Sequence, residues 1–155
     1  MHLHLGVVDR PYRTVRGAGP RRRRRSGAVR KTTTQVAEAL ENRYHIMETF
    51  LEMKHTEIMH DLGEVSKDIL DSSVMPGPPP TRHYRRLEQR VIQRFQNFIR
   101  EREMDGVIPG VPTMASWRGV NHNLSHPYAR RNPIRPSFID TGLYLGSFKA
   151  WVSDD

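Results

Sequence analysis

The sequence contains no cysteine, so it can form neither a disulfide framework nor a thiolate metal site or nucleophile. Apolar residues are also scarce: they make up 36% of the 155 residues, whereas globular domains reach roughly 45–50% when Gly is counted too. No apolar run approaches the roughly 18 residues that cross a bilayer, and LHLGVV near the start is too short for the core of a signal peptide. We therefore expect a soluble, non-secreted protein with a thin core and no membrane partner.

Several catalytic and ligand-binding signatures are missing as well. The sequence has no G-x-S-x-G nucleophile elbow and no glycine loop of the Walker or dinucleotide type. His122 and His126 have a ligand-like spacing of four, but they stand in a proline-bounded loop without a nearby third ligand. His55 and His60 fit ordinary polar positions on the flank of a helix. We expect no cofactor, no metal site and no enzymatic activity.

Positive charge is concentrated at the start of the chain. Residues 1–31 hold ten Lys or Arg against one Asp, whereas residues 32–155 hold fifteen basic and sixteen acidic residues. Five arginines stand in a row at Arg21, Arg22, Arg23, Arg24 and Arg25. Because so little apolar surface can offset the entropy lost on ordering, we expect residues 1–31 to form a basic arm outside the core. Such an arm can bind nucleic acid by neutralising phosphates. It can equally be a solvated tail, or sequence upstream of a start at Val29.

Apolar residues from Thr32 to Asp71 recur at steps of three, four or seven, which predicts one amphipathic helix of about ten turns. They are Val36, Leu40, Tyr44, Met47, Leu51, Ile58, Leu62, Val65 and Ile69. Thr32 and Gln35 predict a capping box at its start. Ile46, Phe50 and Met53 lie off this stripe. We therefore expect a second apolar surface, packed on another helix and on another chain.

Prolines at positions 76, 78, 79 and 80 predict an extended connector. A second helix is expected from about Tyr84 to Met104, with Gly106 as its terminator. Its solvent face is rich in arginine, whereas the first helix is acidic, and this charge difference favours antiparallel pairing. Prolines then recur between Gly106 and Pro136, which leaves room for one short helix from Thr113 to Arg118 that Gly119 would close.

These observations predict a mainly α fold with room for minor β structure. The core is expected to be a long antiparallel two-helix hairpin, with extended proline-rich arms and a short C-terminal helix or strand. The domain boundaries are a basic arm at 1–31, a helical hairpin at 32–106, and a proline-rich arm with an aromatic C-terminal segment at 107–155. Compact domains seldom carry long loops without a binding role, so residues 106–136 are also a candidate interaction segment.

The C-terminal segment gathers apolar and turn-forming residues that either close the core or contact another subunit. This candidate subunit interface consists of Phe138, Ile139, Asp140, Thr141, Gly142, Leu143, Tyr144, Phe148 and Trp151. Aromatic and arginine side chains are enriched at interface hot spots. The Asp-Thr-Gly triplet also occurs around the active carboxylate of retroviral-type aspartic proteases, but that chemistry needs two facing copies on a β-rich chain.

Residues 135–152, RPSFIDTGLYLGSFKAWV, resemble the D-T-G-x-L-x-x-S-[IF] signature of tail-completion or neck proteins of tailed bacteriophages. The matching positions are Asp140, Thr141, Gly142, Leu143, Gly146, Ser147 and Phe148, with Gly146 in place of the usual basic residue. Such proteins often continue into further strands, so the sheet content stays open.

The resemblance implies a non-enzymatic virion structural protein that joins the head connector to the tail. Such a protein forms a homo-oligomeric ring around the DNA channel. It would contact other neck and tail proteins and packaged DNA, and would enter the virion during assembly in the host cytoplasm. The alternative function is a nucleic-acid-binding module that uses the arginine-rich arm.

Overall fold

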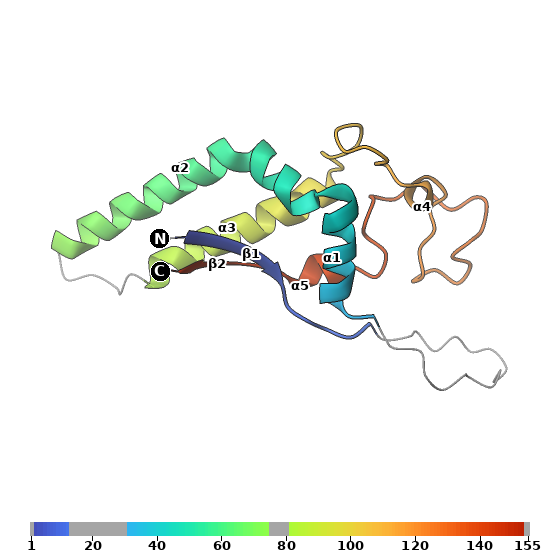
Figure 1. The fold of residues 1–155 in the computed structure, drawn as a ribbon, viewed down its shortest axis with the longest axis horizontal. Helices are drawn as coiled ribbons and strands as arrows, with labels where there is room; N and C mark the ends of the chain where they lie inside the picture. Colours follow the sequence, from blue (N-terminus) through green and yellow to red (C-terminus); the bar gives the residue numbers. More distant parts are fainter. Residues whose placement is uncertain (1, 13–30, 75–80, 154–155) are drawn as a thin grey trace.

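The computed structural model describes residues 2–12, 31–74 and 81–153 (Figure 1). In this part of the chain the elements follow the order β1 (His2–Val7), α1 (Thr33–Tyr44), α2 (Ile46–Val74), α3 (Thr81–Arg100), α4 (Met114–Trp117), α5 (Leu143–Ser147) and β2 (Phe148–Ser153). The fold is therefore mainly α with a small antiparallel sheet, as expected. Arg21 to Arg25 and the proline connector lie outside the described residues.

The single ten-turn helix expected from Thr32 is wrong, because the chain breaks at His45. The predicted capping box at Thr32 and Gln35 is present, and His45 adopts the left-handed conformation with φ 49°. The carboxylate of Glu41 then accepts the backbone N–H of Met47 at 2.9 Å and of Glu48 at 3.1 Å, so it caps α2. The break explains the off-stripe residues, because Ile46 and Phe50 are fully buried at the start of a new helix.

Residues 2–7 do not stand outside the fold. They form β1, which pairs antiparallel with β2 from His2 opposite Ser153 to Val7 opposite Phe148. Leu3, Leu5 and Val7 lie against the core, while Val8 continues the contact by donating its N–H to Ser147 O at 2.8 Å. The expectation of a basic arm over 1–31 therefore needs correction over this stretch, because alternate apolar residues give it a face that the core can bury.

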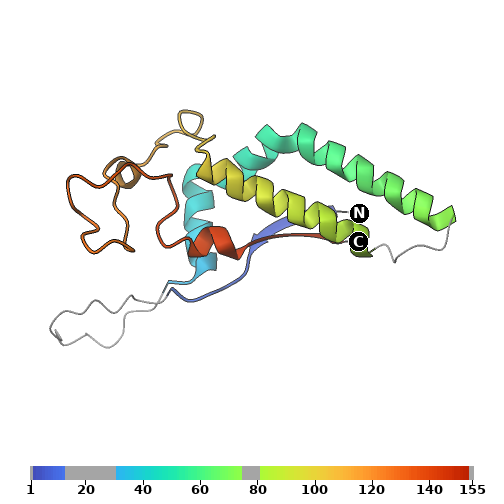
Figure 2. The same ribbon diagram turned by 180° about the vertical axis from the view of Figure 1, so that it is seen from behind.

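The core lies where α2, α3 and β2 meet (Figures 1 and 2). Phe95 of α3 stacks on Phe148 of β2 with ring centroids 3.8 Å apart, and Phe50 of α2 meets Phe95 edge-on at 5.2 Å. Each such aromatic pair contributes about 0.5–1.5 kcal/mol beyond the area that it buries. The C-terminal strand thus takes part in the central packing of the protein.

Ion pairs join α2 to α3 in an antiparallel register. Asp61 of α2 is buried and pairs with both Arg90 at 2.9 Å and Arg94 at 2.7 Å. Arg90 also reaches Glu64 at 2.6 Å, whereas Arg94 reaches Glu57. As residue numbers rise along α2 they fall along α3, so the expected charge complementarity is present between these helices.

The second helix ends at Arg100, six residues before Gly106. Arg102 takes the left-handed conformation with φ 62°. Its N–H donates to Ile99 O at 3.3 Å, and that of Glu103 donates to Phe98 O at 3.2 Å. This pair of bonds is a Schellman motif with an arginine where glycine is usual, and an ion pair from Arg102 to Asp105 at 2.6 Å accompanies it. Gly106, with φ 80°, belongs to the turns that follow.

Residues 106–139, here named the excursion, leave the helices and form one end of the elongated molecule (Figure 1). The C-terminal half of α2 forms the opposite end, in both views of the ribbon. Within the described ranges, no helix combines the length and apolarity needed to span a membrane.

Candidate subunit interface

The Asp-Thr-Gly triplet forms the turn that leads into α5. Gly142 has φ 75°, so its conformation favours glycine as the sequence predicts. The Leu143 N–H donates to Thr141 Oγ1 at 3.3 Å, which fixes the first turn of α5. The triplet therefore sets the direction in which the chain enters the core.

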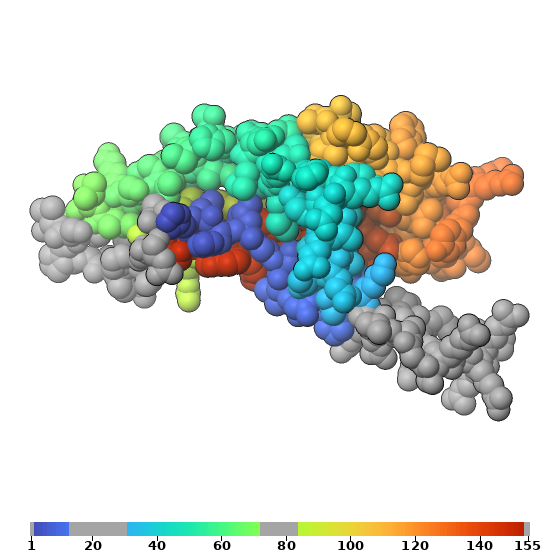
Figure 3. Space-filling model, viewed as in Figure 1, coloured from blue at the N-terminus to red at the C-terminus, as the bar shows by residue number. Residues whose placement is uncertain are grey.

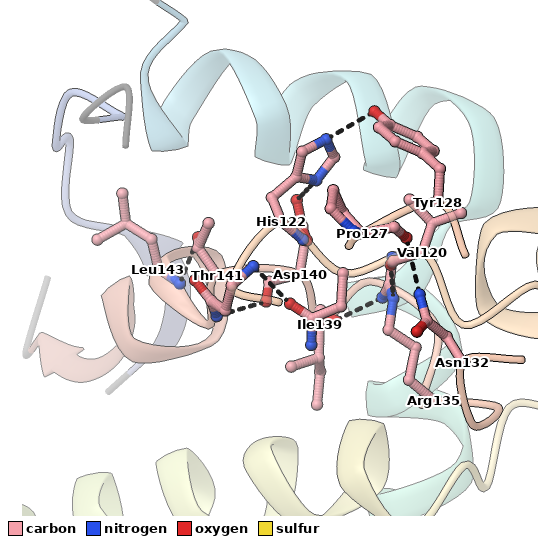
Figure 4. Close-up of polar contacts among 12 residues, drawn as sticks. Val120, His122, Pro127, Tyr128, Asn132, Arg135, Ile139, Asp140, Thr141 and Leu143 are labelled. Carbon is pink, nitrogen blue, oxygen red and sulfur yellow. Dashed lines mark hydrogen bonds and ion pairs between the residues drawn. The ribbon is translucent and has the colours of Figure 1, made fainter. Parts of the chain in front are cut away.

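Asp140 ties this turn to the excursion (Figure 4). Its carboxylate accepts the backbone N–H of His122 at 2.8 Å and lies 2.6 Å from His122 Nδ1. The other ring nitrogen of His122 lies 2.9 Å from the Tyr128 hydroxyl, and Asn123 Nδ2 donates to Asp140 O at 3.1 Å. The hydrogen bonds of Asp140 thus have a structural role. His122 contacts Asp140 and Tyr128 rather than pairing with His126, from which it is four positions away in sequence.

The Arg135 side chain binds three backbone carbonyls of the same region. Its Nε donates to Val120 O, and its Nη1 donates to Pro136 O at 3.1 Å and to Ile139 O (Figure 4). Burial lowers the pKa of this guanidinium, although the nearby Asp140 acts in the opposite direction. A single side chain therefore satisfies three carbonyls of a loop that has few backbone bonds of its own.

The predicted short helix is present as α4, and it anchors the excursion. Thr113 caps it by accepting the Ser116 N–H at 3.2 Å, and Gly119 closes it with φ 59°. Ser116 is fully buried and donates its hydroxyl to Arg135 O, while the Thr113 N–H donates to Ser137 Oγ at 3.1 Å. These bonds hold residues 113–116 of the excursion against residues 135–137.

An open groove of about 670 Å³ runs beside the turn. Its lining comes from the N-terminal segment, the excursion and α5: Arg10, Pro11, Tyr12, Asn123, Thr141, Gly142, Leu143 and Gly146. Burial raises the pKa of Tyr12, and the negative charge of Asp140 adds to that shift. Thr141, Gly142 and Leu143 of the candidate interface therefore border a surface that a neighbouring molecule can reach.

The structure divides the other predicted interface residues into two groups. Tyr144 and Phe148 are only 3% and 1% exposed, so they belong to the core of their own chain. Phe138 and Ile139 are partly buried against the same core, and Phe138 meets the ring of Tyr44 at 5.0 Å. Trp151 is 46% exposed and stacks on His4 at 5.4 Å across the sheet.

Other large exposed apolar side chains lie along α2 and on the excursion. On α2 they are Leu51, Met53, Met59 and Leu70, and on the excursion they are Val107, Met114, Trp117, Leu124, Tyr128 and Ile134. The space-filling view shows both ends open to solvent, α2 in green and the excursion in orange (Figure 3). Of the three off-stripe residues that the sequence assigned to a second apolar surface, only Met53 is exposed, because Ile46 and Phe50 are buried in the core. Nothing in the sequence separated Met114 and Trp117 from core residues.

The N-terminal segment is clamped to the start of α1. Pro11 forms a bridge with Thr32, the Tyr12 N–H donates to Lys31 O at 3.1 Å, and the buried Thr33 hydroxyl donates to Val8 O at 2.7 Å. The chain therefore leaves at Tyr12 and returns at Lys31 beside it. In the sequence, residues 13–30 contain eight arginines and no acidic residue, which equals the net charge of +8 of the whole chain.

One group of side chains has the composition of a metal site. His60, Asp61 and Glu64 bring ligand atoms within 4.8 Å of one another. However, Asp61 and Glu64 both accept hydrogen bonds from Arg90, at 2.9 and 2.6 Å, so a cationic side chain already neutralises these carboxylates.

In comparisons with family models, curated proteins and solved structures, nothing matches this chain.

Proposed function

We propose that this protein is a structural virion subunit of the neck or tail-completion class, which joins the head connector to the tail of a tailed bacteriophage. It acts without catalysis, as one member of a homo-oligomeric ring around the DNA channel. The signature at residues 140–148 supports the class, and the antiparallel contact of α2 with α3 supplies a rigid body for such a subunit.

The observation that carries this proposal is the exposed apolar surface at both ends of the elongated chain. Leu70 near one end is 68% exposed, and Trp117 at the other is 54% exposed. Large exposed apolar surfaces in soluble proteins mark interaction sites. A subunit that must touch two neighbours needs two such surfaces.

Particle composition and morphology test the proposal. Mass spectrometry of purified particles from a phage that encodes this chain should find it in stoichiometric amounts, and deletion of its gene should leave filled heads and tails unjoined. Joined particles without the chain would contradict the joining role.

Nucleic-acid binding is the second candidate function, and the clamp between Tyr12 and Lys31 favours it. The clamp places Tyr12 beside Lys31, and these are the described residues on either side of the segment whose sequence holds eight arginines. Each arginine that neutralises a phosphate releases counterions, so affinity should fall steeply with salt.

Changing all five arginines at positions 21–25 to Ala should weaken binding to duplex DNA and reduce the steepness of log affinity against log salt by about 4.5, which is about 0.9 per lost phosphate contact. Arg85→Ala with Arg86→Ala is the matched control, because both arginines are exposed on α3. An unchanged slope in the five-arginine variant would rule out this candidate.

A further inference from the structure

The two exposed apolar ends differ in chemistry. The outer face of α2 is defined here by Glu52, Met59, Gly63 and Leu70. Glu57, Asp61 and Glu64 of this helix pair with arginines of α3, whereas Glu52, Asp68 and Asp71, with the single base Lys67, form no ion pair among the described residues. Residues 106–139 include no acidic residue, and Arg118, Arg130 and Arg131 are exposed there, while Arg135 bonds to carbonyls inside the excursion. Opposite charges on two apolar surfaces favour contact between them and disfavour contact of either with itself.

The outer face of α2 is a continuous stripe. Its four residues follow one another at steps of seven, four and seven, so they lie on one side of the helix. All four are exposed, whereas Ile58, Asp61 and Val65 are buried on the other side. Glu52 forms no ion pair with any residue that the structure describes, so its charge is available to a partner.

Gly63 is the least expected residue of this stripe. Glycine weakens a helix relative to alanine, yet a Cβ at Gly63 would meet nothing within 4 Å. The fold of the single chain therefore gives no packing reason for glycine here. Because glycine has no side chain, the backbone of α2 is uncovered between Met59 and Leu70, a position called here the Gly63 notch, and a bulky side chain of a partner can approach the helix closely there.

The excursion presents bulky side chains of the matching kind. Met114 and Trp117 stand three positions apart on α4 and are 65% and 54% exposed. The bonds of Ser116 and Thr113 hold α4 in place, so these side chains are presented on a fixed support. Arg118 follows directly and is exposed. Aromatic, methionine and arginine side chains are enriched in interface cores.

From these observations we infer that α4 of one copy docks on the outer face of α2 of the next copy, with Trp117 at the Gly63 notch and Arg118 near the acidic residues of α2. The contact is heterologous, because the two surfaces are different and lie at opposite ends of the chain. Heterologous contacts repeat from subunit to subunit and close into rings when the rotation permits. The inference deepens the proposed function, and it names which surfaces meet in the assembly.

Complementation between two variants tests this contact. Met59→Lys with Leu70→Lys disables the α2 face, and Met114→Ser with Trp117→Ser disables the excursion. Each double variant alone should be monomeric by light scattering, while the unaltered chain forms assemblies larger than a dimer. Loss of two hot-spot side chains, each contributing about thirtyfold, corresponds to association about a thousandfold weaker. Mixed together, the two variants should form a one-to-one heterodimer, because one intact contact remains between them.

Val8→Ser is the matched control. Val8 is exposed but lies on neither surface, so this variant should assemble like the unaltered chain. A monomeric unaltered chain, a double variant that still assembles, or a mixture that stays monomeric would overturn the inference. Circular dichroism melts establish that each variant is folded, and the single changes Leu70→Lys and Trp117→Ser replace any double variant that is not.

A photo-cross-linking residue at position 117 gives an independent readout. It should attach to residues 52–70 of a second, isotope-labelled copy, and attachment elsewhere would contradict the docking. The failure of this contact can be told apart from the failure of the proposed function. A chain that assembles in this way but is absent from particles rejects the virion role alone, whereas a chain found in particles whose two double variants assemble normally rejects the contact alone.

Discussion

At the scale of the residue, Gly119 shows how tightly the excursion is folded. A Cβ on Gly119 would lie 2.2 Å from Pro133 O and 2.8 Å from Asn132 O, both of them backbone atoms. Gly106 also has a positive φ, but a Cβ there would meet nothing within 4 Å. The two glycines therefore separate the effect of backbone conformation from that of close packing.

We expect Gly106→Ala to cost about 1 kcal/mol of unfolding free energy, the usual cost of a left-handed alanine. Gly119→Ala should cost about 3 kcal/mol or more, because the excursion must also move. Urea denaturation of both variants measures the difference. Equal losses would mean that Gly119 is not in close contact with Asn132 and Pro133.

Tyr144 is a second residue with an unusual environment. It is buried, and its hydroxyl finds no hydrogen-bond partner among the described residues. Burial raises its pKa, and the charge of Glu41 adds to that shift. In the unfolded chain the phenol ionises near pH 10, while in the folded chain it stays neutral, so stability should fall as the pH rises above 10.

Tyr144→Phe should therefore raise the unfolding free energy by about 1 kcal/mol at neutral pH, since an unpartnered buried hydroxyl is removed. It should also make the loss of stability above pH 10 less steep. The loss should not vanish, because the pKa values of Tyr12 and Lys54 are raised as well. Denaturation midpoints between pH 8 and 11 test this, and parallel curves for the two proteins would contradict it.

At the scale of the element, the contact between α2 and α3 depends on the buried Asp61. Removing a partner from a buried carboxylate leaves a charge without compensation. We expect Arg94→Met to cost about 2 kcal/mol, less than for a fully buried pair, because Arg90 still contacts Asp61.

Arg100→Met on the same helix is the control for this prediction. Arg100 is exposed and should change stability by no more than about 0.5 kcal/mol. Thermal melts of both variants give the comparison, and similar melting temperatures would show that the ion pairs contribute nothing to the helix contact.

Elements with local signals were predictable from sequence, and those that depend on distant partners were not. The capping box at Thr32 and the α4 helix between Thr113 and Gly119 follow from short hydrogen-bonding patterns. The break at His45 depends on a carboxylate six residues from the amide that it caps, although the off-stripe Ile46 and Phe50 were a usable sign of it. Strand β1 needs a partner at the far end of the chain, which periodicity within a short segment cannot reveal.

The candidate interface was predictable only as a region. The sequence identifies the turn at Gly142, but it does not show that Tyr144 and Phe148 face inwards, because α5 and β2 were expected as one short element. The structural role of Arg135 was not predictable either, because its partners are backbone carbonyls and no sequence motif marks them. Exposure of Met114 and Trp117 follows from the folding of the excursion as a whole.

At the scale of the whole molecule, the N-terminal segment completes the sheet and supports α1. A chain that starts at Val29 would lose β1, both partners of the Thr33 hydroxyl, which are Val8 O and the Arg10 N–H, and the bond from the Thr33 N–H to Arg10 O. We expect this shortened chain to lose its cooperative thermal transition, measured by circular dichroism.

A chain in which a short Gly-Ser linker replaces residues 13–30 is the matched control. It should keep the transition, because Tyr12 and Lys31 already lie side by side and a shorter loop costs less entropy to close. A cooperative transition in the Val29 chain would mean that β1 is dispensable.

The positions of the two tryptophans make two events separately visible by fluorescence. Trp151 stacks on His4 across the two strands, so its emission should respond when the ends of the chain separate. Trp117 lies on α4 in the excursion and is half exposed, so its emission should shift to shorter wavelength when a neighbour covers it. Trp117→Phe would leave Trp151 as the single tryptophan, whose emission reports unfolding. Trp151→Phe would leave Trp117, whose emission reports assembly, and neither experiment needs an added dye.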